Sequence, residues 1–392
     1  MRLIHDVRYF TKEEILNRAE KYEFPNPLAV ELFLWDCELA AQLQHICDDM
    51  ILKGGTAAQL YLPLEKQRGS RDIDVTTSLG SADVHETILK ASKSLEGVVA
   101  FEQYTPLKPV PDLPLVTYLA RTSDKLDETK ELEVKIDISY DNPKLPCLTL
   151  EDVQTYAVTV ERMKCLTAGA LMGDKLLTLA KKSVGLKIES DYPKQIYDMD
   201  ALLESGRISI DTIVDMVTSV KTLTPIEASF RNINVTPIDA LRDVIETMNE
   251  YSEVDTSGAD TKVKGDIERF QQFYVNKTQR KPYYEWASKA LRIRFLATLI
   301  IENMEGSLTE PKIANTIKEC WGIALKINKV SGDAVIDLRK QLLGLASGRI
   351  RYLKELRGKP VDRVFWQIIT PSNLQDAKSL IDNINLRSTS RP

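Results

Sequence analysis

The chain has 392 residues, of which 43% are hydrophobic and 28% charged, and these ordinary values for a globular protein exclude a fibrous or wholly disordered chain. At about 150 residues per domain, this length allows two or three domains. The formal net charge of -5 argues against a protein that coats nucleic acid without specificity, although a local basic surface remains possible.

The cysteines and histidines carry no recognisable site. The five cysteines are scattered without a Cys-x-x-Cys pair, and the three histidines share no metal-ligand spacing. The residues after Met1 lack the apolar stretch of a secretory signal, and the apolar run 296–301 is far shorter than the ~20 residues of a membrane span. We therefore expect a soluble cytoplasmic protein with no membrane partner.

The sequence pattern of the first 50 residues predicts helices. Thr11 precedes an acidic first turn, as an N-cap does, and Pro27 is expected at the first position of a second helix. Apolar residues recur every three or four positions from Val30 to Ala41, so this helix should pack by one face.

The pattern then changes to short strands and later returns to helices. Strands are expected at 51–52, 73–77, 98–104, 115–121 and 131–140, and a helix at 82–95. Later helices are expected at 167–184, 193–204, 236–251, 259–277, 309–328 and 331–356. These patterns indicate an N-terminal helical segment (1–50), a mixed α and β core (51–165), a helical part (166–222) and a helical C-terminal domain (223–392), with 252–262 as the best linker candidate.

A glycine turn is the first candidate site. Lys53, Gly54, Gly55 and Thr56 lie between a short strand and an apolar helix that ends at Pro63. Such a turn presents backbone N–H groups at a helix N terminus, where phosphate oxygens bind, and glycines let the backbone approach closely. A plain tight turn is an equally good explanation of this motif by itself.

Carboxylates on strands form the second candidate site. Alternation places Asp72 and Asp74 on one face of their strand, where their mutual repulsion calls for a cation such as Mg²⁺. Asp137 could join them if its strand is adjacent, and three carboxylates suit two metal ions. The alternatives are a solvated edge strand and, for Asp137, an ion pair with Lys135.

A lysine in an apolar helical stripe is the third feature. Lys175 is spaced by four residues from Leu171 and Leu179, and Met172 and Leu176 flank it. Its ammonium group must either reach solvent or find a partner, such as a triphosphate or a carboxylate.

These motifs, taken in order, resemble the AbiEii-type nucleotidyltransferase toxins of the polymerase-β-like nucleotidyltransferase superfamily. The resemblance covers about residues 45–205 and consists of Lys-Gly-Gly-Thr, Arg-x-Ser-x-Asp-Ile-Asp, Lys-Ile-Asp-Ile, the helical lysine, and Lys-x-x-Tyr-Asp at 194–198. It implies an α+β fold with a polymerase-β-like core, a small mixed sheet with flanking helices, followed by a helical C-terminal domain. In this family an Asp usually stands where this chain has Gln195.

The resemblance also implies roles for single residues. It assigns nucleotide binding to the turn and the loop before the strand, the metal site to the strand carboxylates, and catalysis to those carboxylates and two helical residues. The nucleotide-binding set is Lys53, Gly54, Gly55, Thr56, Arg68 and Ser70; the metal set is Asp72, Asp74 and Asp137; the catalytic set adds Lys175 and Asp198.

The implied function is metal-dependent transfer of a nucleoside monophosphate from an NTP to an acceptor. Two Mg²⁺ ions are expected, and the expected acceptor is RNA, with tRNA as the candidate. The protein would be the toxin of an AbiE-like toxin–antitoxin (abortive infection) system and would have a cognate antitoxin. Two alternatives stay open: a nucleotidyltransferase that acts on a protein or small molecule, and a non-catalytic nucleotide-binding module. Asp198 could also be a helix-surface residue that pairs with Lys194.

The C-terminal half has one charge feature. Residues 339–363 hold eight basic and two acidic residues, which favours either an RNA-binding surface or a solvated helix face. Tyr283, Tyr284 and Trp286 could stack on bases, but their spacing fits core packing better.

Overall fold

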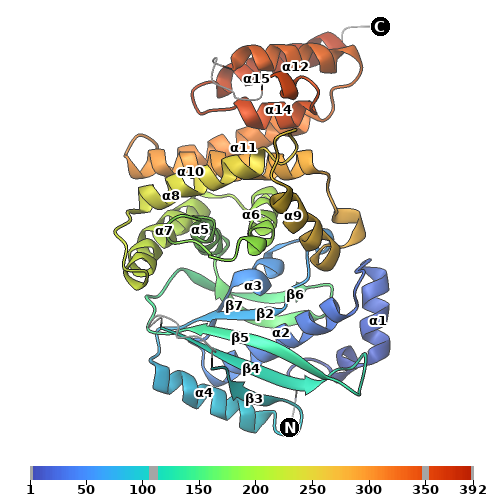
Figure 1. The fold of residues 1–392 in the computed structure, drawn as a ribbon, viewed down its shortest axis with the longest axis vertical. Helices are drawn as coiled ribbons and strands as arrows, with labels where there is room; N and C mark the ends of the chain where they lie inside the picture. Colours follow the sequence, from blue (N-terminus) through green and yellow to red (C-terminus); the bar gives the residue numbers. More distant parts are fainter. Residues whose placement is uncertain (1–2, 106–113, 347–352, 390–392) are drawn as a thin grey trace. The chain divides into compact units, whose positions relative to one another are not determined.

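The structure is a computed structural model that describes residues 3–105, 114–346 and 353–389 (Figure 1). The chain divides into two compact units. The first comprises Met1–Lys175, Asp215–Val235 and Ile267–Arg280, and the second comprises Leu176–Val214, Thr236–Asp266 and Lys281–Pro392. Each unit is therefore built from segments that are far apart in the sequence.

The first unit is organised around a mixed sheet. Within the described residues it has seven strands in the order β3-β4-β5-β2-β1-β7-β6. Their bounds are β1 Ile51–Lys53, β2 Asp72–Thr76, β3 Ala100–Gln103, β4 Leu115–Ser123, β5 Glu131–Ser139, β6 Cys147–Gln154 and β7 Thr159–Leu166. β2 runs parallel to β5, and β1 runs parallel to β7, while the other neighbours are antiparallel. The predicted α+β fold with a mixed sheet is confirmed.

Two strands of this sheet were not predicted. β6 is exposed or half-buried along its whole length, so it shows little apolar alternation. In β7 the buried residues Val160 and Met163 are three positions apart, which breaks the period of two. These strands extend the sheet beyond β1.

The central strands separate an apolar face from a polar one. In β5 every second residue from Leu132 to Ile138 is buried, and in β2 Ile73 and Val75 are buried in the same way. Helix α2 (Leu28–Ile46) contacts β2, β5 and β7 and packs on α4 (Ser81–Ser94), which encloses the apolar side chains. The alternate residues, among them Asp72 and Asp74, are left on the polar face.

Helix α1 (Lys12–Lys21) begins as expected, because the Thr11 side chain accepts a hydrogen bond from the N–H of Glu14. Helix α2 differs from its prediction in two ways. Pro27 is its N-cap rather than its first helical residue, and the helix is buried on all sides from Ala29 to Leu43 instead of packing by one face. Polar side chains of α2 are therefore buried as well.

Several elements around the candidate site deviate from the expected bounds. Helix α3 (Gly54–Tyr61) begins at the first glycine of the turn. Helix α5 (Ala168–Thr178) ends before the predicted 184, because the chain turns at Ala180, whose carbonyl accepts from the N–H of Gly185. Helix α7 (Ile210–Phe230), which contains Pro225, was not predicted. The 3-10 helices are Val7–Phe10, Leu64–Lys66, Glu189–Asp191 and Lys277–Gln279.

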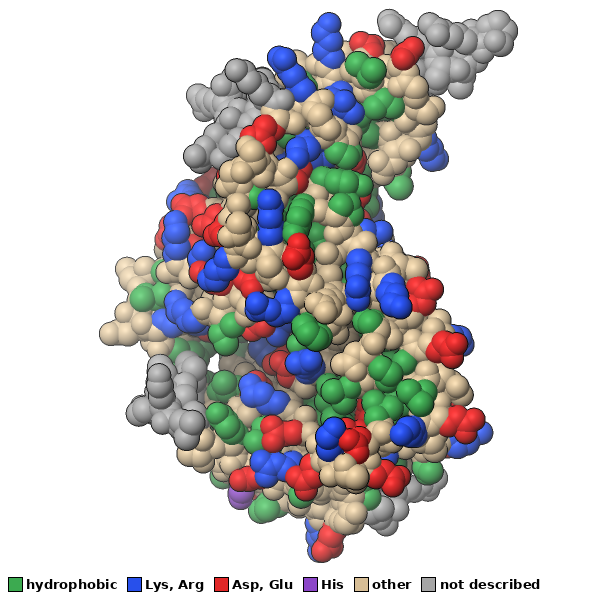
Figure 2. All heavy atoms as spheres, turned by 45° about the vertical axis from the view of Figure 1, so that its right-hand side comes forward, with side chains coloured by type: hydrophobic (Ala, Val, Ile, Leu, Met, Phe, Trp, Pro, Cys, Tyr) green, Lys and Arg blue, Asp and Glu red, His purple; other side chains and the backbone are tan. Residues whose placement is uncertain are grey.

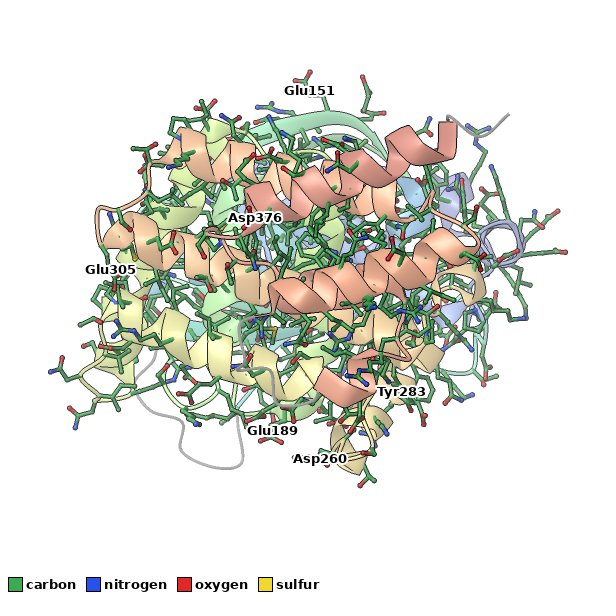
Figure 3. All side chains as sticks on the ribbon, turned by 90° about the horizontal axis from the view of Figure 1, so that it is seen from above. Glu151, Glu189, Asp260, Tyr283, Glu305 and Asp376 are labelled. Atoms are coloured by element: carbon green, nitrogen blue, oxygen red, sulfur yellow. The ribbon has the colours of Figure 1, made fainter. Side chains whose placement is uncertain are left out.

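The described elements of the second unit are helical, which confirms the expected helical C-terminal region. They are α6 Tyr192–Glu204, α8 Pro237–Ser252, α10 Tyr283–Met304, α11 Glu310–Ile327, α12 Asp333–Leu345, α13 Leu353–Leu356, α14 Val361–Ile368 and α15 Leu374–Thr389, while α9 (Thr261–Tyr274) continues into the first unit. The segment predicted as one helix, 331–356, contains both α12 and α13, with 347–352 outside the described residues. Figure 3 shows the long C-terminal helices α12 and α15 side by side, with Asp376 in the first turn of α15.

None of the helices in the described segments combines the length and the hydropathy that a bilayer-spanning segment requires.

Candidate active site

The turn between β1 and α3 holds a carboxylate against a helix N terminus. β1 ends at Lys53, and α3 starts at Gly54, whose φ of +69° lies in the left-handed region. A Cβ atom on Gly54 would lie 1.9 Å from Oδ2 of Asp74. Only glycine therefore fits between the start of α3 and the Asp74 carboxylate.

A buried pair of hydroxyls lies behind this turn. Oγ1 of Thr56 is 3.0 Å from Oγ of Ser70 and 3.0 Å from the carbonyl oxygen of Asp72. It is also 3.2 Å from Oδ2 of Asp36, which belongs to α2. The structure thus brings together Thr56, Ser70 and the start of β2, as the motifs suggested, and it adds Asp36, which the sequence analysis missed.

Arg68 supports the turn from inside the protein. Its side chain is buried, and its Nη1 donates to the carbonyl oxygen of Gly69 at 2.6 Å. Its Nη2 would lie 2.9 Å from a Cβ atom on Gly55, so the guanidinium packs directly against that glycine. The ring of Phe270 lies 6.0 Å from the guanidinium.

The loop between Arg68 and Asp72 is also held by a distant segment. The N–H of Gly69 donates to the carbonyl oxygen of Tyr274 at 2.8 Å, and the guanidinium of Arg71 lies over the Tyr274 ring at 5.0 Å. Residues 267–280 therefore fix the loop that carries Ser70 into β2.

Lys53 is held by a residue of α5. Its Nζ lies 3.7 Å from Oδ1 of Asp174, and its backbone pairs with that of Asp74. The charge of Asp174 raises the pKa of Lys53 against the effect of burial, and the charges of Asp74 and Glu227 add to the rise. The ammonium group of Lys53 is therefore a stable cation beside the Asp74 strand.

Lys175 follows Asp174 on α5 and does not extend into solvent. Its exposed fraction is 2%, although it lies in the apolar stripe predicted for this helix. The sequence left two options for this lysine, a partner or contact with solvent. Its burial excludes contact of the ammonium group with bulk water.

The carboxylates predicted to form a metal site lie on the polar face of neighbouring strands. β2 pairs with β5 in a register that sets Asp74 opposite Asp137 and Asp72 opposite Lys135. The condition stated for Asp137, a neighbouring strand, is therefore met. The ion pair considered as its alternative also exists, because Nζ of Lys135 donates to Oδ2 of Asp137 at 2.5 Å, and Thr117 donates to Oδ1 at 2.6 Å.

The negative charges of this face affect the pKa of Lys135. Burial lowers the pKa of Lys135, but the hydrogen bond to Asp137 and the charges of Asp137, Asp72 and Asp74 outweigh burial and raise it overall. In the described residues, no three Asp, Glu, His or Cys side chains lie close enough together to hold one ion. The face can thus attract a cation, and any ion held here takes its remaining ligands from water or a bound phosphate.

Asp198 belongs to the second unit, on α6, and is fully buried. Burial excludes the helix-surface role considered for it. Lys194, one turn earlier, lies 3.3 Å from Asp191.

A buried ion cluster two residues further along α6 was missed by the sequence analysis. Asp200 accepts from Nζ of Lys289 and from Nε and Nη2 of Arg292, at 2.5, 2.5 and 2.8 Å. The guanidinium of Arg292 also lies near the rings of Trp321 and Trp366, at 5.3 and 5.8 Å. This cluster ties α6 to α10 and is structural.

Three basic residues of the segment 339–363, considered above as an RNA-binding surface or a solvated helix face, have partners within the protein. Arg363 is buried and donates to the carbonyl oxygen of Ser252, and Nζ of Lys359 bonds to Asp255. Arg339 donates to the carbonyl oxygen of Arg357. Arg349, Arg351 and Tyr352 lie outside the described residues, as does the side chain of Lys354. Figure 2 shows blue and red side chains interspersed over the face that it presents.

Of the aromatic residues near 283, Tyr283 and Tyr284 are half-buried. Trp286 is buried, as core packing predicted. The ammonium group of Lys264 lies 5.4 Å from the centre of the Tyr283 ring.

Comparison with protein families decides the classification. The model of the family described as "Nucleotidyl transferase AbiEii toxin, Type IV TA system" matches residues 39–279. The chain belongs to the AbiEii nucleotidyltransferase toxin family. The resemblance read from the motifs is thereby confirmed, and the AbiEii match continues beyond those motifs to the segment 267–280 that holds the Ser70 loop.

Family membership gives the function in outline. As an AbiEii toxin the protein is a nucleotidyltransferase of a type IV toxin–antitoxin system, which implies an NTP substrate and an antitoxin. Helix α10, the helices after it and the basic segment lie beyond the matched residues.

Other comparisons are more distant. A crystal structure from H. pylori, provisionally described as that of a nucleotidyltransferase, is 16% identical, with a TM-score of 0.40 over 75% of this chain and 97% of its own. No curated protein matches the sequence.

Proposed function

We propose that this AbiEii toxin transfers a nucleoside monophosphate from an NTP to a hydroxyl group of RNA, with tRNA as the first acceptor to test, and that a divalent cation, Mg²⁺ above all, assists the reaction. The observation that carries the proposal is the contact between Gly54 and Asp74. It sets a helix N terminus, which favours phosphate, beside a strand carboxylate, which favours a cation.

The residues present fit such a cation. Asp72 and Asp74 are half-buried carboxylates on one strand face, and Asp137 lies beside Asp74 on the next strand. Carboxylate oxygens are the ligands that Mg²⁺ prefers, and Asp72 and Asp74 would hold it, with Asp137 adjacent. When bound, the cation supplies charge neutralisation at the triphosphate and orients the α-phosphate.

The chain's own residues then bind and orient the nucleotide. The N–H groups at the start of α3 donate to phosphate oxygens, Ser70 adds its hydroxyl, and Lys53 contributes a cation held in place by Asp174. Arg68 keeps Gly55 in position from behind rather than reaching the phosphates itself. Catalysis in this arrangement is mainly positioning and electrostatic stabilisation.

The acceptor hydroxyl attacks the α-phosphate in line, forming the new phosphate ester as pyrophosphate leaves. A carboxylate must take the proton of that hydroxyl, and we assign this role to Asp137 or Asp198. The assignment of Asp198, and of Lys175 as a cation for the phosphates, rests on the family motif positions at 175 and 198.

The experiment is to incubate the full chain with each α-³²P NTP in turn, total cellular RNA and Mg²⁺, and to separate RNA from protein on a gel. We expect label in a tRNA-sized band with at least one NTP, and no label with Lys175→Ala. Label on protein alone, or binding of NTP without pyrophosphate release, would contradict the proposed reaction and favour the protein-modifying or the non-catalytic alternative.

A further inference from the structure

Two arginines flank Ser70, and both lie over aromatic rings of α9. The guanidinium of Arg68 is 6.0 Å from the centre of the Phe270 ring. That of Arg71 is 5.0 Å from the centre of the Tyr274 ring. The two rings stack on each other, with their centres 5.8 Å apart and an angle of 19° between their planes. The loop that carries Ser70 into β2 is therefore attached to α9, within the first unit, by two cation–π contacts.

The two arginines differ in what their N–H groups do. The side chain of Arg68 is buried and donates to the carbonyl oxygen of Gly69, so it serves the interior of the turn. Arg71 is exposed, and within the described residues no carboxylate pairs with it. A ring contact uses only the flat face of a guanidinium, whereas the N–H groups lie in its plane and can still donate. Arg71 therefore presents a cation at the surface that is held in place but not neutralised.

The place of Arg71 in the chain suits contact with a substrate. It stands between Ser70, proposed to bind the triphosphate, and Asp72, proposed to hold the cation. Tyr274 fixes this loop through its backbone as well as its ring, because its carbonyl oxygen accepts from the N–H of Gly69. A side chain that is already held in place loses little conformational freedom when it binds a ligand.

A planar guanidinium recognises phosphate through two parallel N–H bonds. At this site phosphate can come from the NTP or from the RNA acceptor. In the proposed site the triphosphate already has the N–H groups of α3, Ser70, Lys53 and a divalent cation as partners. An exposed cation at the edge of that set is better placed for the larger substrate.

The charge of the segment that holds Arg71 also favours RNA. Residues 267–280 contain three basic residues and one acidic one, namely Arg269, Lys277, Arg280 and Glu268. Lys277 and Arg280 are exposed, and the ring-bearing Phe273 before them has an exposed fraction of 43%. Exposed basic residues with an aromatic residue among them are typical of surfaces that bind single-stranded RNA.

We propose that Arg71, held on the Tyr274 ring, binds a backbone phosphate of the acceptor RNA, and that Lys277 and Arg280 continue this contact along the strand. The inference rests on the proposed RNA acceptor. The chain has a net charge of -5, and its proposed site carries carboxylates, so RNA is repelled unless local cations offset that repulsion. Tyr274 is a positioning residue in this arrangement, because it acts on RNA through Arg71.

The test measures the binding of fluorescein-labelled tRNA to the full chain by fluorescence anisotropy, without NTP, over a series of KCl concentrations. Arg71→Gln should weaken binding by about five- to tenfold. It should also lower the slope of log Kd against the logarithm of the KCl concentration by about 0.7–0.9, the contribution of one phosphate contact. In the label-transfer assay KM for tRNA should rise by a similar factor, with KM for the NTP within about twofold of wild type.

Tyr274→Leu separates the ring from the backbone contact. The variant keeps the carbonyl oxygen that accepts from Gly69 and loses the ring under Arg71. Binding of tRNA should weaken by about two- to fivefold, the worth of a cation–π contact at an exposed site. In an Arg71→Gln background, Tyr274→Leu should add less than about twofold, because the ring acts through Arg71. A merely structural ring would instead lower the affinity for tRNA and for the NTP alike, whatever residue stands at 71.

Arg162 provides the matched control. It is an exposed arginine of β7, a strand of the same sheet that lies on the other side of β1 from β2. Arg162→Gln removes the same charge from the same unit. It should leave the tRNA affinity, the salt slope and both KM values unchanged.

Four results would overturn the role of Arg71: wild type without affinity for tRNA, Arg71→Gln that binds tRNA as wild type does, an equal loss for Arg162→Gln, or a rise in KM confined to the NTP. The last result would assign the phosphate to the triphosphate. Binding without NTP also separates this inference from the proposed function. Binding of tRNA that follows the predicted pattern, without label transfer by the wild type, would contradict only the transfer reaction. Transfer to tRNA that Arg71→Gln performs with unchanged KM would contradict only the role of Arg71.

Discussion

The contact between Gly54 and Asp74 gives the sharpest prediction about the site. In Gly54→Ala the new Cβ atom would lie 1.9 Å from Oδ2 of Asp74, whereas real Cβ atoms essentially never approach a heavy atom within 3.0 Å. The carboxylate must therefore move by about 1 Å or more. A displacement of that size at a reacting centre costs about 100-fold in rate. The positive φ adds a backbone cost of roughly 1–2 kcal/mol.

Gly97 separates these two effects. It has a φ of +81°, belongs to the same unit, and has no atom within 4 Å of an added Cβ. Gly97→Ala should therefore have the backbone cost alone, seen as a fall in Tm of about 2–8 °C, with transfer activity unchanged. Gly54→Ala should show at least the same fall in Tm and lose about 100-fold or more in activity. Equal activities of the two variants in the label-transfer assay, at matched folded fractions, would refute this account of the turn.

Three further predictions concern buried charges. Burial raises the pKa of Glu31 to about 7, so the folded state keeps a proton that the unfolded state loses above about pH 4.5, and the free energy of unfolding falls as the pH rises to 7. In Glu31→Gln, urea titrations at pH 5 and pH 8 should show this fall reduced by up to about 3 kcal/mol. The same fall in wild type and variant would contradict this prediction. Asp200→Ala should lower the free energy of unfolding by about 3–5 kcal/mol, because it leaves buried cations unpaired. Glu305→Ala, which removes an exposed ion pair with Arg242, should lower it by less than about 0.5 kcal/mol. Equal melting temperatures of the two variants would refute this prediction. Asp174→Asn should raise KM for the NTP about five- to tenfold by releasing Lys53, with kcat little changed, and an unchanged KM would exclude that anchoring role.

Local sequence signals were sufficient for the centre of the first unit. The alternation in β2 and β5 fixed which side chains share a face, and the register adds that Asp74 and Asp137 are opposite each other. The glycine turn could also be predicted, because a left-handed backbone and the close approach of Asp74 to Gly54 both require glycine.

What the sequence could not provide depends on contacts between distant segments. Asp36 lies in a helix that is buried on every side, so its position in the helical period carried no information about what it contacts. The partners of Asp200 are about 90 residues away in the sequence, on α10. Tyr274, which accepts a hydrogen bond from the N–H of Gly69, is more than 200 residues away from it in the sequence. The partners of Arg363 and Lys359 likewise lie on or just after α8, about 100 residues away, which the sequence alone does not show.

The most direct measurement of the central claim is the single-turnover rate of nucleotidyl transfer by Asp72→Asn and Asp74→Asn beside Glu133→Gln. Glu133 is an exposed carboxylate of β5 that pairs with Arg121 at 3.3 Å and serves as the control for charge loss on the same strands. We predict a loss of about 1,000-fold or more for each aspartate variant and no change for the control, with all three melting within a few degrees of wild type. Aspartate variants that stay folded and as active as Glu133→Gln would contradict a cation-assisted reaction at this face of the sheet.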